Sequence, residues 1–223
     1  MSSKGEETKK RIQKEAAKLF AEYGFNGTST RMIASAAGIN ISAISLYFGG
    51  KQELYNACVT KNKELIKDFY DKAYSMIYED LFNDLMTPKK AREYIEMMID
   101  LQIEVAFRSK YRIVTATIYN ENIQNRTEAS GSLADTVFVK HERLMALLLT
   151  YLVPTTEKRA IICSRYINGS IIAFGEHRNI YQNHVDWSPE DDDFAPQWAI
   201  RMIRGLCIAA LEKFVVEENT VGQ

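Results

Sequence analysis

The sequence predicts an all-α protein with a small N-terminal unit of short helices and a larger helical body. Three observations support this fold class. Apolar residues recur at helical spacing in most segments. The 223 residues include only four Pro and eleven Gly, so few positions interrupt helices. Two short apolar segments near the N-terminus are joined by a single glycine turn. With 46% hydrophobic residues, the chain can form one or two domains with a core.

The first predicted helix covers residues 7–23, where apolar side chains recur three or four residues apart. Its apolar stripe consists of Ile12, Ala16, Leu19, Phe20 and Tyr23. Gly24 follows directly and is suited to ending a helix. The segment Asn-Gly-Thr-Ser-Thr at 26–30 then offers hydroxyls that can cap the next helix.

Two short helices come next. One covers 30–37 and ends at Gly38, and the other begins at Asn40 or Ile41 and ends near Tyr47. Neither is long enough to be stable alone in water. We therefore expect the preceding helix, and a longer one that opens at residue 52, to bury their apolar faces. The side chains expected to be buried there are Ile33, Ala34, Ala37, Ile44 and Phe48, with Leu54, Cys58, Leu65 and Phe69 on the longer helix.

The rest of the chain also has helical periodicity. The strongest helix is 90–108, whose inner stripe is Ile95, Met98, Ile99, Gln102, Ile103 and Ala106. The segment 109–123 is rich in Val, Thr and Ile, as strands are, but its context favours a helix. The further predicted helices are 134–152, 156–180 and 197–217, with loops at 125–133 and 182–196.

Charge is distributed unevenly along the chain. Residues 1–67 carry eleven Lys and Arg against six Asp and Glu, a net charge of +5, and the remainder has a net charge of −6. A basic N-terminal unit favours a polyanionic partner. No apolar run is long enough to span a membrane and no secretory leader is visible, so we expect a cytoplasmic protein. The three cysteines are expected to be reduced and buried.

No sequence motif indicates catalysis, a cofactor or a metal. There is no glycine-rich phosphate loop, no His/Cys set at metal spacing and no nucleophile elbow. The acidic run at 190–193 is expected to be solvated. The sequence therefore predicts neither an enzyme nor a cofactor.

The pair of short helices has the proportions of a helix-turn-helix, whose second helix enters the DNA major groove. We expect Asn40, Ile41, Ser42 and Ala43 to face base edges, with Ile41 and Ala43 near thymine methyl groups. Arg31 lies in the first turn of a helix, where a cation is unfavourable, so it is better explained by a DNA contact. The predicted domains are a DNA-binding domain at 1–52 and a ligand-binding and dimerisation domain at 53–223.

The N-terminal quarter resembles the DNA-binding domain of the TetR family of transcriptional repressors. The similarity covers residues 8–57, through RIQKEAAKLFAEYGFNGTSTRMIASAAGI and SAISLYFGGKQELYNA. The body looks most similar to the branch of CecR-like regulators. The resemblance implies that Ser29 or Thr30, and Lys51, contact phosphates. It also exposes a departure, because the family most often has a tyrosine at the position of Ser45 or Leu46. Here the tyrosine is Tyr47, so we expect Ser45 and Tyr47 to contact the backbone.

A single helix-turn-helix reads too few bases to be selective, so we expect a homodimer on a pseudo-palindromic DNA operator. Helices 156–180 and 197–217 are the predicted interface, unless they belong to the monomer core. A small-molecule inducer is expected in the body. The candidate ligand residues are Met98, Gln102, Tyr119 and His141, with Met97, Asn122, Asn168 and His177 as weaker ones. An ordinary core or surface position is the more common explanation for each of these residues, and Gln102 and His141 are the strongest ligand candidates.

The sequence-based hypothesis is a dimeric repressor that leaves its operator when an inducer binds. Three alternatives stay open at this point: an activator of the same family, an enzyme or carrier with a helical body, and an adaptor dimer whose basic N-terminal unit binds protein.

Overall fold

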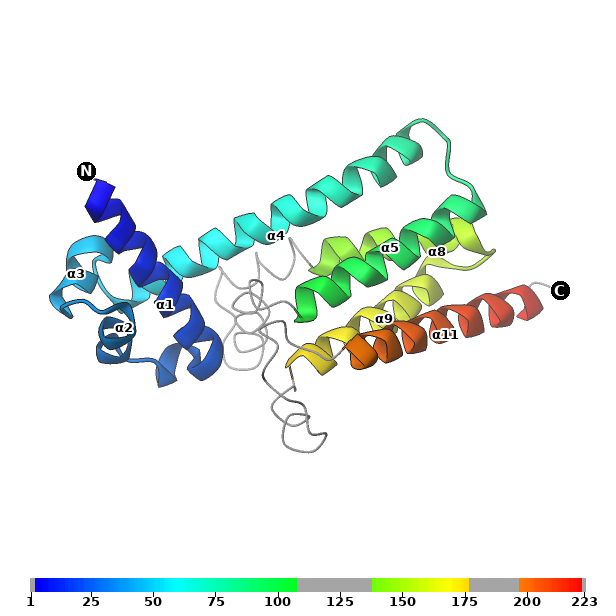
Figure 1. Cartoon of the computed structure of the whole chain (residues 1–223). Coiled ribbons are helices and arrows are strands. Elements are labelled where there is room, and N and C mark those ends of the chain that lie inside the picture. Colours follow the sequence, from blue (N-terminus) through cyan, green and yellow to red (C-terminus); the bar gives the residue numbers. More distant parts are fainter. Residues whose placement is uncertain (1–2, 108–137, 177–196, 222–223) are drawn as a thin grey trace. The chain divides into compact units, whose positions relative to one another are not determined.

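The computed structural model describes residues 3–107, 138–176 and 197–221. Throughout these ranges the regular elements are helices, without strands, as the sequence predicts (Figure 1). The described residues form two compact units, one ending at Ile66 and one made of the described residues from Lys67 onward. Helix α4 (Lys51–Phe82) contributes residues to both.

The N-terminal unit contains α1 (Ser3–Gly27), α2 (Thr30–Ala37), α3 (Ser42–Phe48) and the first part of α4. Helix α1 is longer than predicted at both ends, but Gly24 has non-helical angles (φ 69°, ψ 177°) and breaks it at the predicted stop. The hydroxyl of buried Thr28 bonds the carbonyl oxygens of Leu19 at 3.0 Å and Gly24 at 2.8 Å. It thereby satisfies carbonyls that the broken helix would leave unpaired.

One core joins the four helices of this unit. Its fully buried side chains come from α1, α2, α3 and α4: Ile12, Ala16, Ile33, Ile44, Leu54 and Cys58. The ring of Phe20 meets that of Tyr55 edge-on, 5.0 Å between centroids. Gln13 Nε2 donates to the Ala57 carbonyl at 2.8 Å, a second link between α1 and α4. This packing stabilises α2 and α3, which are too short to be stable alone.

Two apolar positions were predicted wrongly in this region. Leu65 is 45% exposed, and its neighbour Ile66 is fully buried instead. Spacing from Cys58 favours Leu65, which is turned from it by only about 20°, whereas Ile66 is turned by about 80°. Beyond Cys58 the buried face of α4 instead follows Ile66, Tyr70 and Tyr74, and Leu65 lies outside it. Tyr23 is 50% exposed, because the break at Gly24 follows it directly.

The second unit packs α5 (Pro88–Phe107), α8 (Lys140–Leu152), α9 (Glu157–Glu176) and α11 (Gln197–Val221) against one another. The predicted inner stripe of α5 is buried at all six positions. Thr156 caps α9, accepting a bond from the Arg159 amide at 3.4 Å. The three cysteines are free and buried, as expected. The predicted helix 109–123, the loops at 125–133 and 182–196, and residues 177–180 lie outside the described residues.

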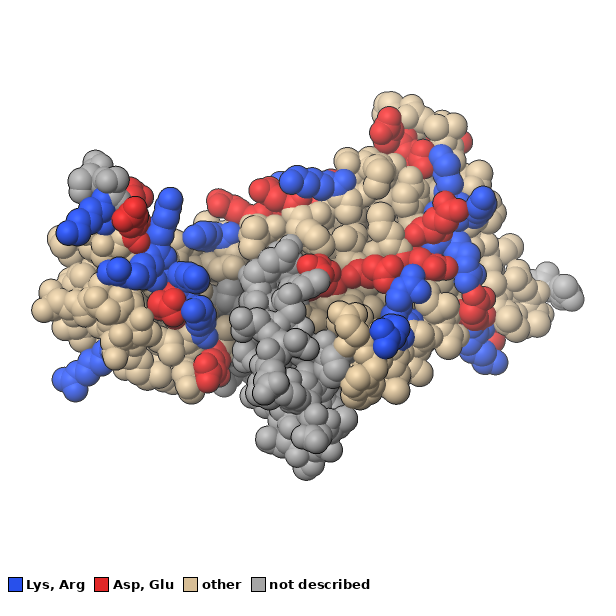
Figure 2. All heavy atoms as spheres, viewed as in Figure 1, with Lys and Arg blue, Asp and Glu red and all other residues tan. Residues whose placement is uncertain are grey.

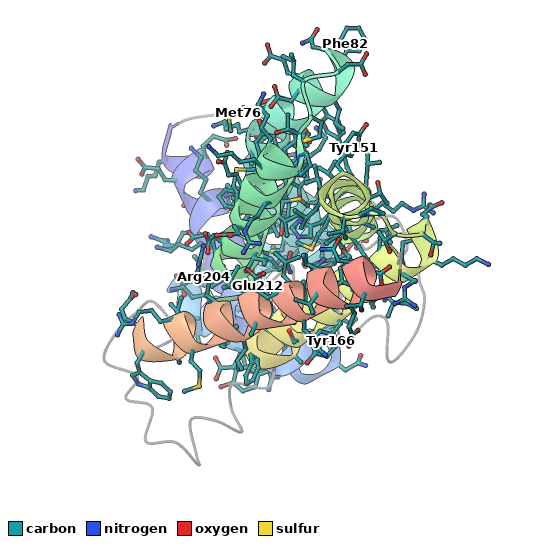
Figure 3. The ribbon with its side chains drawn as sticks, turned by 90° about the vertical axis from the view of Figure 1, so that its right-hand side faces the viewer. Met76, Phe82, Tyr151, Tyr166, Arg204 and Glu212 are labelled. Atoms are coloured by element: carbon teal, nitrogen blue, oxygen red, sulfur yellow. The ribbon has the colours of Figure 1, made fainter. Side chains whose placement is uncertain are left out.

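Ion pairs connect α5 to α11. Arg204 Nε lies 2.6 Å from Asp100 Oδ1, and its Nη2 lies 3.4 Å from Glu96 Oε2. Arg92 pairs with Glu212. Figure 3 shows Arg204 and Glu212 on the edge of α11 that faces α5. These pairs set how α11 lies along α5, while their exposure to solvent keeps each contribution to stability small.

Candidate nucleic-acid interface and buried polar cluster

Helices α2 and α3 meet at a sharp angle in the N-terminal unit. A turn of residues 38–41 separates them, and the chain bends by 93° between the two helices. Helix-turn-helix motifs join two helices at about 90–120° through a turn of similar length. Among the described residues no single helix is long and apolar enough to cross a membrane, and only this bent pair taken together reaches that length and composition.

The turn is fixed by local hydrogen bonds. Ser29 caps α2, its hydroxyl accepting from the Met32 amide at 3.2 Å. Gly38 adopts the left-handed conformation (φ 60°, ψ 46°), and the following amide of Ile39 donates to the Ala34 carbonyl at 3.0 Å. A Cβ on Gly38 would meet no atom within 4 Å, so the glycine is required by its backbone angles and not by lack of space.

The start of α3 is organised by Asn40. Its Oδ1 accepts from the Ser42 amide at 3.0 Å and from the Ser42 hydroxyl at 2.9 Å. This bonding orders the first turn of α3, whose Ile44 is only 1% exposed and anchors the helix to the core. The opposite side of α3 consequently faces solvent.

The ten residues predicted to contact DNA lie at the cap of α2, on α2, in the turn, on α3 or at the first residue of α4. The exposed members are Ser29, Arg31, Asn40, Ile41, Ser42 and Ser45, and the partly buried ones are Thr30, Ala43, Tyr47 and Lys51. They therefore all lie within residues 29–51 of the N-terminal unit. Leu46, which was not among the predicted residues, lies on α3 as well and is 79% exposed, because the inward register of Ile44 turns it outward.

Two lysines lie over aromatic rings beside this region. Lys51 Nζ lies 4.2 Å from the centroid of the Phe25 ring, and Lys9 Nζ lies 5.7 Å from that of Phe48. Such contacts hold a cation in place without neutralising it. Figure 2 shows Lys and Arg gathered over α1, whereas the surface over α3 carries no charged side chain.

A chain of polar side chains crosses the core of the second unit. Tyr70 donates to Gln102 Oε1 at 2.9 Å, and Tyr74 is bonded to His141 Nδ1. On the other side of the ring, His141 Nε2 lies 3.0 Å from Asn168 Oδ1. These side chains come from α4, α5, α8 and α9, so the network connects four helices.

Burial favours the neutral form of His141, and its two bonds then fix which ring nitrogen carries the proton. The Asn168 amide oxygen can only accept, so the proton is on His141 Nε2, and Nδ1 accepts from the Tyr74 hydroxyl. Burial lowers the pKa of His141 to about 4, against a smaller opposing effect of Asn168. Burial also raises the pKa of Tyr74, so both groups stay uncharged at neutral pH.

Gln102 is the unusual member of the cluster. It is completely buried, and its Nε2 has no hydrogen-bond partner among the described residues. Of the other candidate ligand residues, Met98 is fully buried one turn earlier on α5 and His141 is 1% exposed. Asn168 bonds His141 directly. Tyr119, Asn122 and His177 lie outside the described residues.

An open groove of about 700 Å³ runs along the outer face of α5, away from this cluster. Its lining residues are Phe69, Lys89, Arg92, Glu93, Glu96, Met97, Asp100, Leu101 and Glu104. Two of its acidic groups, Glu96 and Asp100, are paired with arginines. The groove includes Met97 from the candidate ligand residues, but neither Gln102 nor His141.

The α2–α3 region and the buried polar cluster define the class of protein. It consists of a helix-turn-helix unit followed by a helical body with polar side chains in its core. Residues 12–58 match the family model for bacterial regulatory proteins of the tetR family. The chain is similar to the HTH-type transcriptional dual regulator CecR of Shigella flexneri, with 29% identity over 204 residues, 86% of each chain.

Two solved structures have the same fold. One is a transcriptional regulator from Saccharomonospora viridis in complex with choline, with a TM-score of 0.62 and 15% identity over 93% of this chain and 96% of that one. The other is FadR from Bacillus subtilis in complex with stearoyl-CoA, with a TM-score of 0.55 and 17% identity over 92% and 97%. The family match identifies residues 12–58 as a DNA-binding segment of the tetR type, and the chain as a whole is similar to transcriptional regulators of that family.

Proposed function

We propose that this regulator is a repressor that binds a pseudo-palindromic operator as a homodimer and is released by a small-molecule inducer. The observation that carries the proposal is the geometry of α2 and α3, a 93° pair whose second helix is anchored by Ile44 and exposed on its other side. The proposal assigns operator binding to residues 1–52 and ligand binding and dimerisation to 53–223. It locates the protein in the cytoplasm, together with its DNA.

In this proposal the residues of the N-terminal unit divide into two groups. Phosphates are contacted by Ser29, Thr30, Arg31, Ser45, Tyr47 and Lys51, and base edges by Asn40, Ile41, Ser42 and Ala43. The capping position of Ser29 and the fixed Nζ of Lys51 support the first group, because both present donors or charge at the surface. The solvent-facing side of α3 supports the second group.

The dimer would form through α9 and α11, which pack side by side (Figures 1 and 3). Large apolar side chains remain exposed on both helices. The most exposed are Ile162 at 69%, Tyr166 at 67%, Leu206 at 59% and Met202 at 57%. Contiguous apolar surface of this kind is typical of a protein interface. A second copy of the chain would cover it with an identical surface, in the isologous manner of a two-fold dimer.

The inducer would bind in the second unit, next to Gln102. A buried amide donor without a partner costs about 1–3 kcal/mol, which a ligand acceptor would recover. Met98 and His141 would be its neighbours, with Tyr119 as a further predicted contact. That two relatives of the same fold are complexes with choline and stearoyl-CoA supports a ligand-binding body. A coupling free energy of about 1–3 kcal/mol between the sites would change operator affinity several-fold to over a hundredfold.

The test is selection of duplex DNA from a random-sequence library by the purified full-length chain, followed by footprinting of the enriched sequence. The expected result is a two-fold symmetric site, bound with an affinity that falls as salt rises, with a slope near −0.9 for each phosphate contacted. No enrichment, or an affinity that does not depend on salt, would refute the proposal. The similarity to CecR, a dual regulator, favours activation at some promoters as a second function. Reporter assays with the site placed at different distances from a promoter would distinguish the two.

A further inference from the structure

The outward face of α3 has an unusual composition. Four residues on it are exposed, namely Ile41, Ser42, Ser45 and Leu46. At about 100° per residue they occupy a single arc of roughly 140°, with the two serines between the two apolar side chains. Leu46 is 79% exposed and Ile41 is 44% exposed, whereas Ile44 on the inner face is 1% exposed.

The side chains that usually distinguish purines are missing from this helix. Residues 42–48 read Ser-Ala-Ile-Ser-Leu-Tyr-Phe, without Arg, Lys, Asn, Gln, Asp or Glu. Guanine is typically read by Arg or Lys and adenine by Asn or Gln, through paired hydrogen bonds. Asn40 precedes the helix, but its Oδ1 is already bonded to the amide and hydroxyl of Ser42. The exposed face of α3 therefore offers two hydroxyls and two apolar groups.

In the major groove, the apolar feature of a base pair is the C5-methyl group of thymine. We infer that Leu46 and Ile41 read thymine methyl groups in each operator half-site, and that Leu46 is a specificity-determining residue. This inference rests on the proposed DNA-binding function. The two residues are five positions apart, about 7.5 Å along the helix axis. This corresponds to roughly two steps of 3.4 Å along a DNA strand, so the two thymines lie about two base pairs apart.

The size of the effect follows from the area of a methyl group. Removing one contacted methyl weakens binding about fourfold, the equivalent of about 0.8 kcal/mol. A two-fold symmetric operator contains each contact twice, so the paired change weakens binding by about 15-fold.

The experiment replaces thymine by deoxyuracil, which lacks only the C5-methyl group, at symmetric pairs of positions in the selected operator. The dissociation constant of the full-length chain is measured at one salt concentration for each pair. At one symmetric pair of operator positions, we expect deoxyuracil to weaken the binding of the wild type about 15-fold and to leave the binding of Leu46→Ala unchanged. Leu65→Ala is the matched control, the same change at an exposed leucine of α4 outside the proposed DNA contacts, and should retain the full thymine preference.

The outcomes separate this inference from the proposed function. If selection enriches no sequence, the proposed function fails and the inference fails with it. If a specific operator is found but deoxyuracil is tolerated at every position, DNA binding stands and methyl recognition is refuted. A deoxyuracil penalty that persists unchanged in Leu46→Ala would likewise remove Leu46 from the recognition of thymine. Because Leu46 is largely exposed, its replacement leaves the core of the unit intact.

Discussion

Acidification is expected to destabilise the second unit through His141. The ring is buried and bonded on both sides, by Tyr74 and Asn168, and burial lowers its pKa to about 4 from the ordinary value of 6.5. A proton on the buried ring would be poorly solvated, and Tyr74 could no longer donate to Nδ1. The unfolded chain, in contrast, exposes the same ring to water and protonates it readily.

The direction and the size of this pH effect follow from the difference in proton binding between the folded and unfolded states. Between the two pKa values the unfolded state binds more protons than the folded state, so the free energy of unfolding rises with pH and is lost as pH falls through this window. From about pH 7.5 to about pH 5 the loss from His141 alone is about 2 kcal/mol. The full difference between pKa values of 6.5 and about 4 corresponds to about 3 kcal/mol at lower pH.

The assay is urea-induced unfolding followed by circular dichroism, at fixed protein concentration and several pH values between 5 and 7.5. His141→Gln keeps a polar side chain of similar length and should remove about 2 kcal/mol of the pH dependence, whatever its effect on stability at neutral pH. The matched control, Ser170→Ala, removes a hydroxyl from the same unit but keeps His141, and should keep the wild-type slope.

A wild-type free energy of unfolding that is constant between pH 5 and 7.5 would refute this reasoning. So would an unchanged slope in His141→Gln. Should that variant fail to fold, NMR titration of the wild type decides the question directly, because a His141 pKa above about 6 contradicts the burial argument.

Further predictions concern the DNA-binding unit and the dimer. Lys51→Ala should weaken DNA binding equally on specific and random duplexes, whereas Ser42→Ala should change the base preference at one operator position. Equal losses of affinity on both duplexes for both variants would contradict these separate roles in phosphate and base contact. Gly38→Ala should lower the unfolding free energy by about 1 kcal/mol, because φ of 60° strains an alanine, and thermal unfolding measures it. Replacing Tyr166 and Leu206 by Asp should yield monomers in analytical ultracentrifugation, while the same change at exposed Phe82 should not.

Features decided over a few residues could be predicted from the sequence. Helix α2 has the predicted bounds, with Ser29 as its cap and Gly38 as its left-handed end. All six predicted positions on α5 are buried, since a 3.6-residue period fixes which side chains share a face, although Ala91, Val105 and Phe107 are buried as well. The same period extended over a long helix was less informative. In α4 it led to Leu65 in place of Ile66, because the buried face of this long helix does not keep one direction from Leu54 to Ile77.

The sequence by itself thus determined the fold class, the two short helices and the residues that cap and end α2, because capping, periodicity and charge are local properties. Only the tertiary structure decided which polar groups meet in the core. Tyr74 and His141 are 67 residues apart, and His141 and Asn168 are 27 apart. It likewise left the Gln102 Nε2 without a hydrogen-bond partner among the residues that the structure describes. Burial and partners depend on how several helices pack at once, and no window of sequence contains that information.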